Sequence, residues 1–166
     1  MTPRDFESDE RLLEELPRDL PTLWGPFEVL NILGRGGMGV VYRARPVAGG
    51  PEVALKVNVR ADAMWLARFE REGQLVARLR HPGIVRVHSA GELGGLLYIA
   101  YAYVEGARTL GDLLAEGLER ERALDLVQEA AEAVAYAHSQ GVVHRDLKPE
   151  TGTFELARAK RGRARR

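Results

Sequence analysis

The chain has 166 residues, enough for one modest domain with its own hydrophobic core, and its 45% apolar and 29% charged residues are typical of a globular protein. Lys plus Arg and Asp plus Glu are equal at 24 each, so the net charge indicates no class of partner. The absence of cysteine excludes disulfides, thiolate metal sites and a cysteine nucleophile, and it suits a cytoplasmic protein.

Residues 1–26 are largely acidic and are interrupted by prolines. They contain no apolar segment of the kind that a secretory signal needs, and we interpret them as an acidic N-terminal leader outside the fold. The longest apolar run of the chain, LGGLLYIAYAYV, is too short to span a bilayer, so we expect no transmembrane segment.

Three strands are predicted after this leader. The segment PFEVLNIL carries apolar residues in a strand-like pattern, and VVYRAR resumes β-type composition after a glycine-rich stretch. The segment EVALKVNV alternates strictly, which places Val53, Leu55 and Val57 on one face of a strand and Ala54, Lys56 and Asn58 on the other.

A helix and a hairpin are predicted next. Apolar residues recur at helical spacing from about Asp62 to Leu79, and the segment His81-Pro82-Gly83 ends this helix. The segments IVRVHSAGEL and GLLYIAYAYV predict two strands joined near Gly94 and Gly95.

Two helices then follow. Thr109 is the predicted N-cap of a short helix, with Asp112 in a capping-box arrangement. The longest helix is predicted from about Glu119 to Gln140, with one stripe formed by Leu124, Val127, Ala131, Val134 and His138. The order of elements predicts an α+β lobe, with a five-stranded antiparallel sheet and one helix, followed by the beginning of a helical lobe.

The glycine-rich stretch GRGGMGVVY fits the pattern G-x-G-x-x-G, in which glycines let backbone amides approach phosphates. A flexible hairpin turn explains the same pattern equally well. A dinucleotide-binding fold is disfavoured, because a strand-like segment follows the glycines and Lys56 stands where an acid is needed.

Lys56 and Glu72 are candidate partners. By itself Lys56 reads as a lysine on the solvated face of a strand, and Glu72 as a glutamate flanking the core. A charge among the apolar residues of a helix is costly unless it is paired, so an ion pair between the two explains both residues together.

Five segments appear in the order and at the spacing of a eukaryotic-type protein kinase: GRGGMGVVYRA, VALKV, RFEREGQLVARLRHPGIVRVH, LYIAYAYVEG and AHSQGVVHRDLKPE. Residues 27–150 therefore resemble the bacterial Hanks-type Ser/Thr kinases. The resemblance implies the kinase fold, with the N-lobe at residues 27–104 and the start of the C-lobe at residues 105–150. It also implies phosphoryl transfer from ATP to Ser or Thr hydroxyls of a protein substrate.

The resemblance implies a role for each matching residue. Asp146 would accept the proton of the substrate hydroxyl and Lys148 would neutralise the transferred phosphoryl group. The glycine loop would cover the phosphates, Lys56 and Glu72 would hold them, and the segment from Tyr101 would form the rear of the adenine pocket and the hinge. The expected ATP-binding residues are Leu33, Gly34, Arg35, Gly36, Gly37, Met38, Gly39, Val40, Val41, Ala54, Lys56, Glu72, Tyr101, Ala102, Tyr103 and Val104.

The likeness stops after Glu150. The family places Asn at the position of Thr151 and an Asp-Phe-Gly segment after it, and both supply Mg²⁺ ligands, yet no Asp or Asn follows Asp146 here. Mg²⁺ is therefore expected for the family, but its ligands are missing from this sequence. We expect a truncated kinase domain that is inactive on its own, and we predict no metal site.

Residues 151–166 form a basic tail without family character, and we expect it to be disordered. Its last eleven residues carry six Lys or Arg. A change of reading frame explains this tail; a basic arm for nucleic acid or membrane is the alternative, which the lack of interleaved aromatic residues disfavours. A second interpretation of the whole chain is a catalytically dead, pseudokinase-like module that binds nucleotide or docks a partner.

Overall fold

The computed structural model describes residues 16–17, 20–36, 39–58, 76–143, 147–149 and 153–154. The chain forms two compact units, one from residues 1–78 and 85–103 and the other from residues 79–84 and 104–166. Among the described residues no helix is long and apolar enough to cross a membrane.

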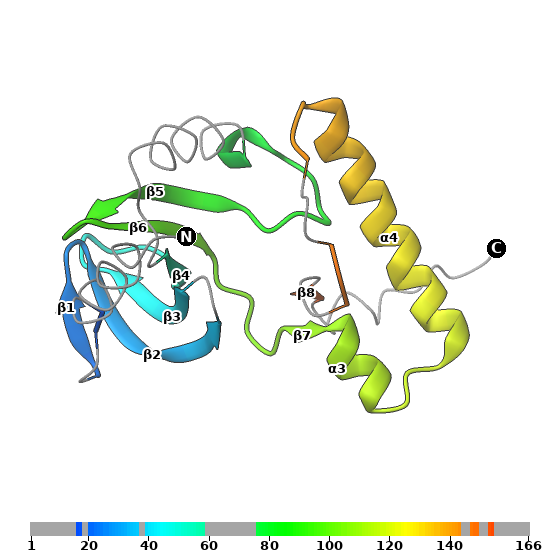
Figure 1. The fold of residues 1–166 in the computed structure, drawn as a ribbon, viewed down its shortest axis with the longest axis horizontal. Coiled ribbons are helices and arrows are strands. Elements are labelled where there is room, and N and C mark those ends of the chain that lie inside the picture. The colour runs from blue at the N-terminus through cyan, green and yellow to red at the C-terminus, as the bar shows by residue number, and fades with distance from the viewer. Residues whose placement is uncertain are drawn as a thin grey trace, which may run out of the picture. The chain divides into compact units, whose positions relative to one another are not determined.

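The first unit is built on a six-stranded antiparallel sheet with the strand order β1-β2-β3-β4-β6-β5 (Figure 1). The strands are β1 (Thr22–Trp24), β2 (Phe27–Gly36), β3 (Gly39–Pro46), β4 (Val53–Asn58), β5 (Val87–Leu93) and β6 (Leu96–Ala102). The three strands and the hairpin predicted from the sequence are all present, and the hairpin turns at Gly94 and Gly95 as expected.

One face of this sheet forms the core. Because side chains alternate along a strand, β3 buries every second residue and β4 does the same, so one face is apolar and the other half-exposed. The buried cluster contains Val29, Val40, Tyr42, Ala44, Val53, Leu55, Val57, Leu96 and Ala100, together with Leu16 and Phe27. Burial raises the pKa of the Tyr42 phenol, whose hydroxyl donates to the Pro17 carbonyl at 3.1 Å.

The predicted leader is wrong for the part of residues 1–26 that the structure describes. Leu16 is 5% exposed within the core cluster, and β1 extends the sheet beyond the five predicted strands by pairing with β2. Trp24 packs edge-on against Tyr98, with ring centroids 6.1 Å apart. Pro21 directly precedes β1 and Pro26 lies in the turn between β1 and β2, so neither proline occupies a paired position of these strands.

The second unit contains a short strand pair and two helices. The elements are β7 (Arg108–Thr109), α3 (Leu110–Ala115), α4 (Arg120–Ser139) and β8 (Thr153–Phe154), with β7 antiparallel to β8. The predicted capping box is confirmed: the Thr109 hydroxyl accepts from the Asp112 amide at 3.1 Å, and the Asp112 carboxylate accepts from the Thr109 amide at 2.9 Å. The hydrogen bond from the Thr109 amide, and then one from its side chain, lower the pKa of the Asp112 carboxyl.

Helix α4 lies within two residues of its predicted bounds, but the sequence did not identify its buried face. Leu126 and Ala133 are buried, whereas Leu124 and Val127 of the predicted stripe are 60% and 50% exposed. His81 stacks on Tyr136 of α4 with ring centroids 5.1 Å apart.

Two further predictions fall partly outside the described residues. Of the helix predicted over 62–79, the structure describes residues 76–79; residues 76–78 are helical, and Leu79 lies just outside the helix. Of the tail at 151–166 it describes residues 153–154, and these form β8 rather than the disordered segment expected there.

Candidate functional site

The half-exposed face of the sheet gathers several residues that the sequence singled out. Residues paired across an antiparallel sheet point to the same face, and Lys56 pairs with Val41 on one side and with Ile99 on the other. Gly34 pairs with Val41 in the same row. Ala54, which lies two residues before Lys56 on β4, pairs with Tyr101. Gly34, Val41, Ala54, Lys56 and Tyr101 are therefore neighbours on one surface, opposite the core.

This surface suits a flat ring next to a phosphate chain. Val41, Ala54 and Lys56 are each half-buried, and Ala54 is small enough to leave room beside the lysine. Burial raises the pKa of the Tyr101 phenol above its ordinary value, so this side chain stays neutral at physiological pH. The surface thus offers apolar contacts and the Lys56 cation for an anionic ligand.

Two glycines of the loop differ in what they permit. Gly39 has φ +143°, and a Cβ at this position would lie 1.9 Å from the Val57 carbonyl oxygen, so β3 and β4 need glycine here for their own approach. A Cβ at Gly34 would meet nothing within 4 Å. The open space at Gly34 is the place where a ligand can come close to the backbone.

The segment after β6 is held by two backbone hydrogen bonds within the first unit. The Ala102 amide donates to the Arg86 carbonyl at 2.7 Å, and the Tyr103 amide donates to the Glu52 carbonyl at 3.3 Å. Val104 belongs to the second unit, where its carbonyl accepts from the Ala107 amide at 3.3 Å.

The other predicted site residues are placed as follows. Leu33 lies at an irregularity of β2 between the pairs Ile32–Tyr42 and Gly34–Val41, and it is 43% exposed. Arg35 is exposed on β2. Val40 is 3% exposed in the core, on the face opposite Lys56, so the prediction that it contributes to the ATP site is corrected: strand alternation points this side chain away.

The remaining predictions lie mostly outside the described residues. Gly37, Met38, Glu72 and Asp146 are not described, and for Gly36 only its place in β2 is given. The expected pair of Lys56 with Glu72 therefore stays a prediction. Lys148 is exposed in the second unit, where the neighbouring Pro149 carbonyl accepts from the Gly111 amide at 3.0 Å.

Magnesium does not fit the residues present. Within the described part of the chain no three His, Cys, Asp or Glu side chains gather as metal ligands. The sequence carries neither Asp nor Asn after Asp146, the two residue types from which the family takes its Mg²⁺ ligands.

The sequence matches the protein kinase domain over residues 27–151. This chain belongs to the protein kinase family. The half-exposed surface thus belongs to the sheet of a kinase N-lobe, and the family is enzymatic. The matched residues cover the four strands of that surface, β2, β3, β4 and β6, and continue into the second unit as far as residue 151.

Its relatives are bacterial kinases. The chain is 42% identical over 139 residues to serine/threonine-protein kinase pkn2 of Myxococcus xanthus, covering 81% of this chain and 17% of that protein. It is 40% identical over 144 residues to serine/threonine-protein kinase PknJ of Mycobacterium tuberculosis, covering 85% and 24%. The chain thus spans about a fifth of the length of these curated relatives.

Solved structures agree with the fold. The chain superposes on the crystal structure of the Mycobacterium tuberculosis PknI kinase domain with a TM-score of 0.73 and 32% identity, covering 84% of this chain and 60% of that chain. The predicted fold, a kinase N-lobe sheet followed by the beginning of a helical lobe, is confirmed, with six strands in place of five.

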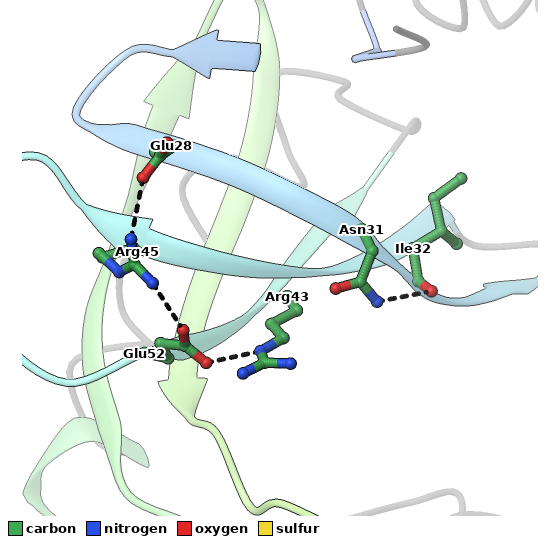
Figure 2. A network of polar contacts seen from close by, with 6 residues as sticks. All are labelled: Glu28, Asn31, Ile32, Arg43, Arg45 and Glu52. Atoms are coloured by element: carbon green, nitrogen blue, oxygen red, sulfur yellow. Dashed lines mark hydrogen bonds and ion pairs between the residues drawn. The ribbon is translucent and has the colours of Figure 1, made fainter. Parts of the chain in front are cut away.

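Sequence reasoning missed an ionic chain beside this surface. Figure 2 shows Glu28, Arg45, Glu52 and Arg43 connected from β2 through β3 to the residue before β4. These charged residues alternate with apolar residues along the strands, and no single one of them indicates an ion pair from the sequence alone. The available signal was their placement on two successive predicted strands, with Arg43 and Arg45 near the end of one and Glu52 at the start of the next.

Proposed function

We propose that the first unit binds ATP on the half-exposed face of its sheet, as part of a serine/threonine protein kinase domain. Val41 and Ala54 contact the adenine ring, Lys56 binds phosphate oxygens, and the open backbone at Gly34 lets the phosphates approach. Tyr101 closes the rear of the adenine site. The segment Ala102–Val104 offers backbone groups to the adenine edge.

The observation that carries this proposal is the register of β3, β4 and β6. It sets Lys56 beside Val41, and Ala54 beside Tyr101, on a face that the core does not use. A lysine among apolar neighbours is costly unless an anion or an acid accompanies it, and a nucleotide supplies both the ring and the anion.

The reaction follows from the family and the names of the relatives. We propose transfer of the γ-phosphoryl group of ATP to a Ser or Thr hydroxyl of a protein substrate in the cytoplasm, with Asp146 as the base and Lys148 as a cation on the phosphoryl group. Phosphoryl transfer depends on positioning and on neutralising phosphate charge. Because the Mg²⁺ ligands of the family are missing from this sequence, we expect this 166-residue chain to bind nucleotide without transferring phosphate efficiently.

A transfer assay with the purified chain tests whether it is inactive on its own. Labelled ATP and a generic protein substrate are incubated with the wild type, with Asp146→Asn and with Lys56→Met. We expect no transfer above the two variants; transfer that both variants abolish would contradict the inactive chain and show that it works without the family's metal ligands.

Thermal unfolding with ATP tests the nucleotide site itself. ATP should raise the Tm of the wild type, since a ligand that binds only the folded state stabilises it. The increase should disappear in Lys56→Met and persist in the control Lys160→Met, which removes a lysine outside the proposed site. A wild-type Tm that ATP leaves unchanged would remove nucleotide binding as a function and leave partner docking.

A further inference from the structure

An ionic chain runs along the edge of the proposed site and ends at the segment after β6. Arg43 donates from Nε to Glu52 Oε2 at 2.5 Å, and Arg45 donates from Nη2 to Glu52 Oε1 at 3.1 Å. Arg45 also donates from Nη1 to Glu28 Oε2 at 3.4 Å. Both oxygens of Glu52 are thus engaged, as Figure 2 shows.

Glu52 is the centre of this chain. Its side chain is 22% exposed, less than those of Arg43, Arg45 and Glu28 at 34%, 51% and 41%. The hydrogen bond from Arg43, and then that from Arg45, lower the pKa of Glu52, so its carboxylate stays charged through the physiological range.

Glu52 and Arg43 each make a contact with Tyr103. The Glu52 carbonyl accepts from the Tyr103 amide at 3.3 Å. The guanidinium carbon of Arg43 lies 4.9 Å from the centroid of the Tyr103 ring, within the range of a cation–π contact. Arg43 therefore touches both Glu52 and Tyr103.

These contacts lie one step beyond the end of the sheet. The last pair of β4 with β6 is Val53 with Ala102, and Tyr103 is the next residue along. Tyr103 is therefore not held by strand pairing between β4 and β6. Its position depends on the hydrogen bond of its amide and on the contact of its ring. Arg43 pairs in register with Ala54, which places it beside a residue that we propose contacts the adenine ring.

We infer that Arg43 and Glu52 are positioning residues for the segment Ala102–Val104, which they hold through Tyr103 in the arrangement that binds the adenine edge. This inference rests on the proposed nucleotide site. Glu52 orients the guanidinium of Arg43 and supplies the backbone acceptor, and Arg43 holds the aromatic ring. The alternative is an ordinary surface ion pair, which commonly contributes little.

The test compares Glu52→Gln with the matched control Glu28→Gln in the full chain. Each change removes one carboxylate from the same ionic chain, but only Glu52 touches Arg43. Binding of a fluorescent ATP analogue is measured by anisotropy, and amide hydrogen exchange at Tyr103 is followed by NMR. The free energy of unfolding of each variant is measured as well.

We expect Glu52→Gln to weaken nucleotide binding about two- to fivefold and to speed exchange at Tyr103, because the cation is no longer held over the ring. Arg43→Met, which keeps the aliphatic stem, should do the same. Glu28→Gln should leave the dissociation constant and the exchange rate at Tyr103 as in the wild type. Where Arg43→Met fails to fold, Glu52→Gln decides alone.

The inference is overturned if both Glu52→Gln and Arg43→Met bind nucleotide like the wild type, or if Glu28→Gln has the same effect as they do. Failure of the proposed function looks different. In that case the wild type binds no analogue at all, and exchange at Tyr103 still shows whether Arg43 and Glu52 hold the segment.

Discussion

At the residue scale, the glycines of the loop do not share one role. Gly39 is needed by the sheet itself, because its φ of +143° and the nearby Val57 carbonyl leave no room for a side chain. Gly34 borders open space and carries no such constraint. The sequence pattern predicted phosphate contact for both, since the letters do not show which glycine the fold requires.

Alanine substitution should separate these two roles. Gly39→Ala should lower the free energy of unfolding by at least about 2 kcal/mol, through a strained backbone and a clash with β4. Gly34→Ala should change it by no more than about 1 kcal/mol and should weaken nucleotide binding instead. Urea unfolding measures the first effect; equal losses of stability in the two variants would contradict the distinction.

The stability that Glu52 contributes should depend on pH. Its pKa is lowered in the folded state, chiefly by the hydrogen bond from Arg43, so its contribution to stability is present above its ordinary pKa of 4.5 and is lost as pH falls through the lower folded value. The wild type should therefore be more stable than Glu52→Gln at pH 7, and the difference should shrink below pH 4.5. Unfolding curves of both proteins over this range provide the test, and a difference that stays constant on acidification would count against the ion pair.

At the element scale, local signals predicted the second unit well. Thr109 and Asp112 mark the start of α3, and α4 lies within two residues of the bounds read from its periodicity. Its buried face was not predictable, because Leu126 and Ala133 belong to a helix with apolar residues on more than one side, and periodicity does not say which side a neighbour covers.

The first strand was missed for a different reason. β1 has three residues and is preceded by prolines, so no alternating pattern is long enough to show a strand. Its stability comes from non-local contacts: pairing with β2 and the burial of Leu16 under the sheet. Such contacts join segments that are far apart in the sequence and leave no local signal.

Leu16 should therefore be required for the stability of the first unit. Leu16→Ala removes a side chain that is 5% exposed, and we expect it to lower the free energy of unfolding by about 2 kcal/mol or more. Leu23→Ala, at a side chain that is 71% exposed on β1, is the control and should change stability by less than about 0.5 kcal/mol. Indistinguishable unfolding curves for Leu16→Ala and the wild type would show that residues before β1 do not support the sheet.

At the scale of the whole molecule, the motifs predicted the family and the general fold. The register of β3, β4 and β6 is the reason that the residues of the proposed site share one face of the sheet. Five motifs in order were enough to predict a kinase lobe, because each motif occupies a fixed place in that fold. The ionic chain to Tyr103 was not predictable in the same way, since it depends on cross-strand register and on the turn before β4. Lys56 belongs to one of the five motifs, and the cross-strand register places it on the surface of the proposed site.

Titration of the full chain with ATP, in the wild type and in Lys56→Met, tests the central claim most directly. Isothermal titration calorimetry should show saturable binding to the wild type, and Lys56→Met should weaken it by at least about tenfold, because a charge-assisted hydrogen bond to phosphate is lost. Lys160→Met should bind like the wild type. Equal affinities of Lys56→Met and the wild type would contradict nucleotide binding on this face of the sheet.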